Sequence, residues 1–110
     1  MSTAARLFSA FLLVLCAAAG NLAFAEPYPN KAIRLLVPFP PGEPADILAR
    51  IIAQRMTEGF GQQIIVDNRP GANTIIAAEM GAKAAPDGYT LLMAIDSTLS
   101  MNTAMYTKLP

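Results

Sequence analysis

The chain has 110 residues, with eight basic and eight acidic side chains and no histidine. This length allows one domain at most, and the neutral charge balance argues against a nucleic-acid partner that is held by neutralising phosphates. The only cysteine, Cys16, lies in the apolar amino-terminal stretch. A disulfide framework is therefore excluded, and packing must hold the folded part together.

The first 25 residues have the three parts of a secretory signal peptide. A short amino-terminal region carries the basic residue Arg6, and residues 7–19 form an uncharged, mostly apolar core. An Ala-x-Ala cleavage site then ends at Ala25, directly before Glu26. The apolar stretch is shorter than the ~20 residues that span a membrane, which disfavours an uncleaved anchor. We expect cleavage after Ala25 and no membrane insertion of the mature chain, residues 26–110.

The mature chain begins with an expected strand and helix. Residues 33–37 are almost continuously apolar, which is typical of a strand that is covered on both faces. Residues 45–60 predict an amphipathic helix with Asp46 and Arg50 paired four residues apart. Its apolar stripe is expected to pack on the sheet and consists of Ile47, Leu48, Ile51, Ile52, Met56 and Phe60, with Arg50, Gln54, Thr57 and Glu58 mostly facing away.

The same alternation then repeats. Residues 63–67 predict a second strand, and a Pro-Gly turn leads to a second helix over residues 74–84 with Asn73 or Thr74 as its N-cap. Residues 89–95 predict a third, mostly buried strand.

The order of strand, helix, strand, helix and strand predicts an α/β unit with a parallel three-strand sheet. Parallel strands require crossover connections, and two right-handed crossovers place every segment that follows a strand at one edge of the sheet. These segments are residues 38–46, 68–74 and 96–100. Open α/β sheets bind ligands at that edge, so we expect the three segments to face one crevice.

The segment over residues 38–46 is stiff, because its four prolines fix φ and only Gly42 can readily adopt a positive φ. Pro44 suits the first helical position, so the following amides lie at a helix N-terminus, where a carboxylate or phosphate can bind. The alternative is a well-capped helix start that binds nothing. The amides in question belong to Gly42, Glu43, Ala45 and Asp46.

The residue inventory argues against an enzyme. The mature chain has no histidine or cysteine, which removes the commonest general base and most transition-metal ligands. Ser97 follows Asp96, and this pair is interpreted as a polar cap rather than a catalytic pair. Arg69 is a candidate to bind a carboxylate bidentately, or else a loop carbonyl or an acidic neighbour. We predict no catalytic residue, no metal and no cofactor.

Four ordered motifs carry a family resemblance that covers essentially all of the mature chain. Together they resemble the amino-terminal part of Bug-type receptors, the periplasmic solute-binding proteins of tripartite tricarboxylate transporters. The motifs are YPNKAIRLLVPFPPG at residues 28–42, DILAR at 46–50, VDNRPGA at 66–72 and AAPDGYTLL at 84–92.

The resemblance implies a fold, a ligand class and a set of ligand loops. The fold is a type II periplasmic-binding-protein-like Venus flytrap, of which residues 26–110 are a partial first domain. The ligand loops are the proline-rich segment and the segment after the third strand, with residues 68–74 as a weaker candidate. The implied ligand-binding residues are Phe39, Pro40, Pro41, Gly42, Glu43, Ala45, Asp46, Asp96, Ser97 and Thr98.

The resemblance also implies a periplasmic receptor that captures small organic carboxylates, and transient contact with membrane transporter subunits. The chain is expected to be an incomplete form of such a receptor. The alternative within the family is a truncated, nonfunctional remnant, and the alternative outside it is an exported enzyme.

Overall fold

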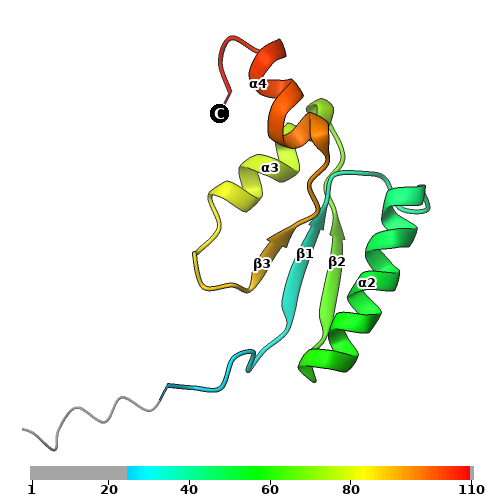
Figure 1. Cartoon of the computed structure of the whole chain (residues 1–110), viewed down its shortest axis with the longest axis vertical. Helices are drawn as coiled ribbons and strands as arrows, with labels where there is room; N and C mark the ends of the chain where they lie inside the picture. Colours follow the sequence, from blue (N-terminus) through cyan, green and yellow to red (C-terminus); the bar gives the residue numbers. More distant parts are fainter. Residues whose placement is uncertain (1–24, 110) are drawn as a thin grey trace, which may run out of the picture.

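The computed structural model describes residues 25–109, which form an α/β unit on three parallel strands (Figure 1). β1 (Ile33–Val37) lies between β2 (Ile64–Asn68) and β3 (Thr90–Leu92), in the order β2-β1-β3. Both pairings are parallel. The expected parallel three-strand unit of a partial α/β domain is therefore confirmed. The predicted signal peptide lies outside the described residues except for Ala25.

Two helices cover opposite faces of the sheet. α2 (Pro44–Phe60) connects β1 to β2, and α3 (Ile75–Ala82) connects β2 to β3. Leu35 and Val37 of β1 belong to the buried cluster under α2, whereas Leu36 points to the other face. A Cβ atom at Gly81 of α3 would lie 3.8 Å from Leu36 Cδ1. Because β1 is buried on both faces, it needs the nearly continuous apolar sequence that it has.

The predicted apolar stripe of α2 is wrong. The helix turns Asp46, Ala49 and Ala53 toward the sheet instead, and only Met56 of the predicted stripe is partly buried. Thr57, which was expected to face away, accepts a hydrogen bond from the Ile64 amide at 3.1 Å. The small alanines allow close packing, and polar contacts on the same face fix the rotation of the helix.

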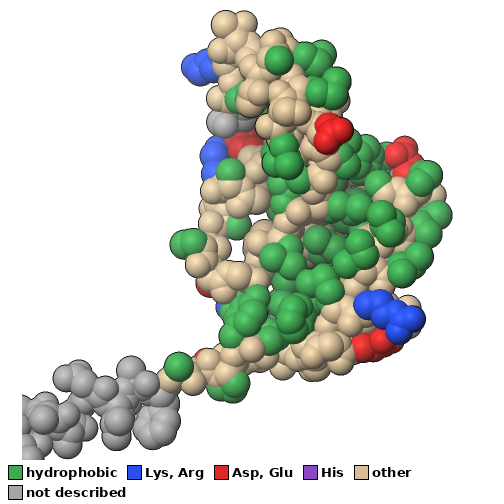
Figure 2. All heavy atoms as spheres, viewed as in Figure 1, with side chains coloured by type: hydrophobic (Ala, Val, Ile, Leu, Met, Phe, Trp, Pro, Cys, Tyr) green, Lys and Arg blue, Asp and Glu red, His purple; other side chains and the backbone are tan. Residues whose placement is uncertain are grey.

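The large apolar side chains of α2 consequently lie on its outer surface. The exposed side chains are Ile47, Leu48, Ile51, Ile52 and Phe60, between 41% and 55% exposed. In Figure 2, hydrophobic side chains gather along α2 and over the sheet on the face in view. None of the helices between residues 25 and 109 is long and apolar enough to cross a membrane.

The third strand and the segment after it differ from expectation. β3 ends at Leu92 rather than at residue 95, and the polar segment over residues 96–100 is helical rather than a loop. It forms a π-helical turn, η2 (Ser97–Met101), which continues into α4 (Asn102–Met105). This short helical segment lies beyond the carboxyl ends of the strands (Figure 1).

Candidate ligand-binding site

The three segments that follow the strands gather at one edge of the sheet, because all three strands are parallel. The first segment joins β1 to α2, and the second joins β2 to α3 through the short helix η1 (Ala72–Thr74). The third contains η2. The predicted gathering of the three segments at one edge is therefore confirmed.

The proline-rich segment has the backbone that its sequence predicts. Gly42 adopts a φ of 89°, in the left-handed region that favours glycine. Glu43 is extended and forms the N-cap position, and Pro44 begins α2. Glu43 has an exposed side chain that makes no capping hydrogen bond, so its carboxylate adds a negative charge at the helix N-terminus.

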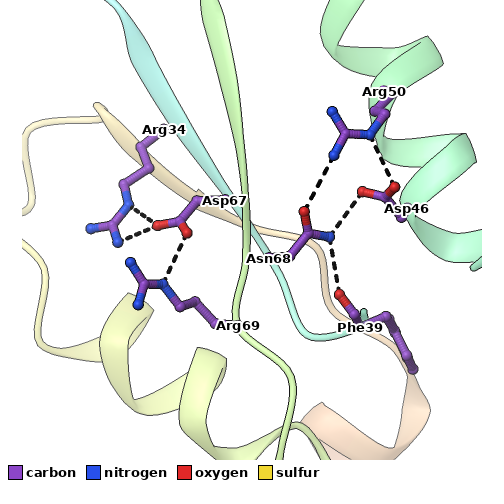
Figure 3. Close-up of polar contacts among 7 residues, drawn as sticks. All are labelled: Arg34, Phe39, Asp46, Arg50, Asp67, Asn68 and Arg69. Atoms are coloured by element: carbon purple, nitrogen blue, oxygen red, sulfur yellow. Dashed lines mark hydrogen bonds and ion pairs between the residues drawn. The ribbon is translucent and has the colours of Figure 1, made fainter. Parts of the chain in front are cut away.

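The Asp46 side chain accepts three hydrogen bonds at this edge, and the residue is only 2% exposed. One oxygen, Oδ2, accepts hydrogen bonds from the Gly42 amide and Arg50 Nε, both at 2.9 Å. The other oxygen accepts from Asn68 Nδ2 at 2.8 Å (Figure 3). The bonds from Arg50, Gly42 and Asn68 lower the pKa of Asp46 from 3.8 to about 2, against the opposing effect of burial.

Asp46 therefore occupies part of the anion seat that the sequence predicts, because its own carboxylate takes the Gly42 amide. The helical hydrogen bonds begin at Ile47, whose amide donates to the Glu43 carbonyl at 3.0 Å. The amides of Ala45 and Asp46 precede that bond, so the helix itself gives them no acceptor. Of the predicted seat, the Gly42 amide is thus taken by Asp46 and the Glu43 amide donates to the Pro40 carbonyl at 3.5 Å.

Asn68, the last residue of β2, joins the proline-rich segment to the second segment. Its Nδ2 donates to the Phe39 carbonyl at 3.0 Å as well as to Asp46, and its Oδ1 accepts from Arg50 at 3.3 Å. The family resemblance implies only a weaker ligand role for residues 68–74. The sequence signal is a carboxamide at the end of the second strand, but nothing in the sequence identifies its partners.

Asp67 points to the opposite side of β2 from Asn68, toward two arginines (Figure 3). Arg34 pairs with one oxygen of Asp67, and Arg69 Nε donates to the other at 2.9 Å. Burial raises the pKa of Asp67, but the hydrogen bonds from the two arginines outweigh it and keep the pKa below its ordinary value. Arg69 therefore binds an acidic neighbour, Asp67, which is one of the partners expected for it.

The second and third segments are joined by a polar cluster. Asn73 Nδ2 donates to Asn102 Oδ1 at 2.7 Å, and Asn102 Nδ2 donates to the Asn73 carbonyl at 2.8 Å. The Thr98 and Thr74 hydroxyls lie 2.9 Å apart. Thr74 precedes α3 as predicted, but its side chain makes no capping hydrogen bond, because its hydroxyl serves this cluster.

The ten predicted ligand-binding residues fall into three groups by exposure. Pro40, Pro41, Gly42, Glu43 and Asp96 are exposed, and Phe39, Ala45, Ser97 and Thr98 are partly buried. Asp46 is buried and fully engaged. The assignment of all ten to ligand contact stays a prediction. Over residues 25–109, no three His, Cys, Asp or Glu side chains are grouped so that they could hold a metal ion.

Known proteins resemble this chain in sequence. The model of the tripartite tricarboxylate transporter family receptor matches residues 48–110. The Bordetella pertussis protein BugT is 39% identical over 87 residues, which are 78% of this chain and 27% of that protein. A protein encoded in the tcbD-tcbE intergenic region of Pseudomonas sp. is 44% identical over 86 residues, which are 77% of this chain and 25% of that protein.

Solved structures agree with the sequence matches. A periplasmic transporter superposes with a TM-score of 0.73 at 48% identity, over 76% of this chain and 28% of that one. The R. palustris protein Rpa4515, solved with adipate, superposes with a TM-score of 0.60 at 43% identity, over 62% of this chain and 23% of that one. The chain therefore spans less than a third of these relatives' lengths. The predicted resemblance is confirmed: this chain belongs to the receptor family of tripartite tricarboxylate transporters and has part of the α/β fold of periplasmic binding proteins.

Proposed function

We propose that this chain carries one wall of a periplasmic receptor site for small organic carboxylates. One observation supports this most strongly: in a chain of this receptor family, the three segments that follow the strands gather at the carboxyl edge of a parallel sheet. The proline-rich segment also begins a 17-residue helix, whose N-terminus favours negative charge.

The backbone amide of the partly buried Ala45 is the proposed anion contact in the first segment. The charged Asp46 side chain holds the Gly42 amide and thus keeps the turn before α2 in place. In this proposal Asp46 is a positioning residue, and the ligand meets the exposed residues 40–43 and the partly buried Ala45. Across the edge, Asp96, Ser97 and Thr98 at the start of η2 complete the contacts of this chain.

Glu43 sets a charge preference in this proposal. Its exposed carboxylate stands beside the helix N-terminus, where it opposes an anionic ligand. We expect Glu43→Gln to increase affinity for a dicarboxylate more than for a monocarboxylate, because repulsion grows with ligand charge. Glu58→Gln, at an exposed position near the other end of α2, is the matched control for loss of one negative charge.

Calorimetry tests the ligand class. The longest polypeptide that the reading frame encodes around this chain is titrated with adipate, citrate, glutamate and nicotinate, and with adipamide as the neutral analogue of adipate. Adipate is included because one solved relative carries it. We expect binding of at least one carboxylate and none of adipamide. Binding of neutral or cationic solutes alone would contradict the proposal.

Export and partnership follow from the same proposal. We expect the mature protein to begin at Glu26, which mass spectrometry of the periplasmic fraction measures directly. We also propose that the receptor delivers its ligand to the membrane subunits of a tripartite transporter, as the family description implies. Loss of uptake of the labelled ligand after deletion of the coding region, with recovery on complementation, is the expected result.

A further inference from the structure

Residues 68–74, here called the bridging segment, contact both candidate ligand segments. At its first residue, one Asn68 side chain donates to the Phe39 carbonyl and to Asp46 and accepts from Arg50. One carbonyl of the β1–α2 connection and two side chains of α2 therefore share a single carboxamide.

The other end of the bridging segment contacts α4 through Asn73 and the third segment through Thr74. Asn73 and Asn102 exchange two hydrogen bonds, of 2.7 and 2.8 Å, and the Thr74 hydroxyl contacts that of Thr98. Asn102 is 2% exposed and Thr74 is 5% exposed, so water does not substitute readily for these contacts.

The backbone between the two ends is strained. Ala72, Asn73 and Thr74 have φ values of 46°, 50° and 73°, three successive left-handed residues without a glycine among them. Such conformations are unfavourable for residues with a Cβ atom and persist where surrounding contacts over-determine them. The Arg69 amide adds one such contact by donating to the Val37 carbonyl at 2.7 Å.

In the part of the chain that the structure describes, the two ligand segments are not hydrogen-bonded to each other. Among residues 25–109, no hydrogen bond joins residues 38–46 to residues 96–100, whereas both are bonded to the bridging segment. We propose that the bridging segment is a strut that sets the position of both ligand segments, with Asn68 and Asn73 as its positioning residues. The strut itself follows from the contacts above, and only its effect on ligand affinity rests on the proposed function.

Amide hydrogen exchange, resolved by residue in NMR spectra, tests the strut without any ligand. In Asn68→Asp a carboxylate replaces the donor and faces two acceptors, Asp46 and the Phe39 carbonyl. We expect the Gly42 amide to exchange at least tenfold faster, while the amide of Leu35 in the central strand changes less than twofold. Gln63→Glu is the matched control, because it adds the same charge at the opposite end of β2 on an exposed side chain.

A charge swap provides the rescue. In the double variant Asn68→Asp with Asp46→Asn, the new amide at position 46 donates to the new carboxylate, and its oxygen still accepts from Gly42 and Arg50. We expect most of the Gly42 protection to return. A merely destabilised fold would not recover, because Asp46→Asn alone removes a charge that Arg50 and Gly42 bind. If Asn68→Asp does not fold, Asn68→Ala replaces it, and we expect the same increase of at least tenfold in the exchange rate of the Gly42 amide.

The other end of the strut has its own variant. Asn73→Ala removes the donor to Asn102, and we expect the Thr98 amide, which donates to the Ile95 carbonyl at 2.9 Å, to exchange at least tenfold faster. Exchange at Gly42 and Thr98 that matches the Gln63→Glu control in both variants would overturn the strut.

Affinity is measured separately on the longest encoded polypeptide, with adipate as the probe. If the unmodified protein binds adipate, we expect Asn68→Asp and Asn73→Ala each to weaken binding at least tenfold relative to Gln63→Glu. Unchanged affinity in both would overturn the positioning role. If the unmodified protein binds no carboxylate, the proposed function fails, and the exchange measurements alone decide the strut.

Discussion

The carboxyl group of Asp46 should titrate far below the pH at which a free aspartate does. Its pKa is lowered from 3.8 to about 2, first by the hydrogen bond from Arg50 and then by those from Gly42 and Asn68. This difference corresponds to a proton affinity that is weaker by on the order of 50- to 100-fold. Since the folded-state pKa lies below the unfolded one, the charged carboxylate stabilises the fold fully above about pH 3.8.

That stabilisation is lost as pH falls from about 3.8 to about 2. The assay is a titration of the Asp46 side-chain carbon by NMR, with the Gly42 amide shift followed in the same samples. Protonation removes the negative charge from the acceptor of the Gly42 amide and weakens that hydrogen bond, so we expect both signals to move with one midpoint near pH 2. The variant Arg50→Gln lacks the arginine hydrogen bond, which is the main cause of the lowered pKa, so the Asp46 midpoint should rise toward 3.8.

Two results would refute this reasoning. An Asp46 midpoint at or above 3.8 would mean that burial outweighs the three donors. A Gly42 shift that titrates independently of Asp46 would mean that the carboxylate does not hold the turn before α2.

Three further predictions concern stability, measured by denaturant unfolding of the chain. Thr57→Val leaves the Ile64 amide without its acceptor and should lower the free energy of unfolding by about 1 kcal/mol, whereas Thr57→Ser keeps the hydroxyl and should lower it less. Ala72→Val places a branched side chain at a φ of 46° and should lower stability by ~1–2 kcal/mol relative to Ala72→Gly, which accepts that φ without strain; equal stability of the pair would contradict the strain. Leu36→Ala empties a fully buried site and should lower stability by ~2–5 kcal/mol, against less than about 1.5 kcal/mol for Leu36→Met.

The sheet could be predicted because its signals are local. The apolar run of β1 and the Pro-Gly turn after β2 give the alternation of strands and helices, and the crossover rule then gives parallel strands. Gly42 and Pro44 likewise gave the turn and the first residue of α2, since each has a backbone preference that neighbours do not alter.

The rotation of α2 could not be predicted in the same way. Hydrophobicity alone favours burial of Ile47 and Ile51, whereas the helix buries Ala49 and Ala53. What fixes the rotation is a set of polar contacts to residues far along the chain, above all Asp46 with Asn68. A hydrophobic stripe in the sequence contains no information about such partners.

The polar cluster was missed for a similar reason. Asn73 and Asn102 are separated by 29 positions and are ordinary turn and helix residues when each is considered alone. Residues 96–100 were expected to form a loop because they are a polar segment that directly follows the third predicted strand. In the structure these residues make a helical turn, and the Thr98 hydroxyl contacts the bridging segment.

The central place of β1 has a consequence for how the protein assembles. The first strand to leave the ribosome or the export channel is also the most apolar, and its two neighbours, β2 and β3, come much later in the chain. Until Leu92 has emerged, β3 is incomplete, so at least one backbone edge of β1 lacks its hydrogen-bonding partner strand. Pairing between strands that are distant in the sequence slows folding, and it prolongs the time during which the apolar β1 strand is exposed and prone to aggregate. We therefore expect newly made chains to depend on holding chaperones more than their small size would suggest.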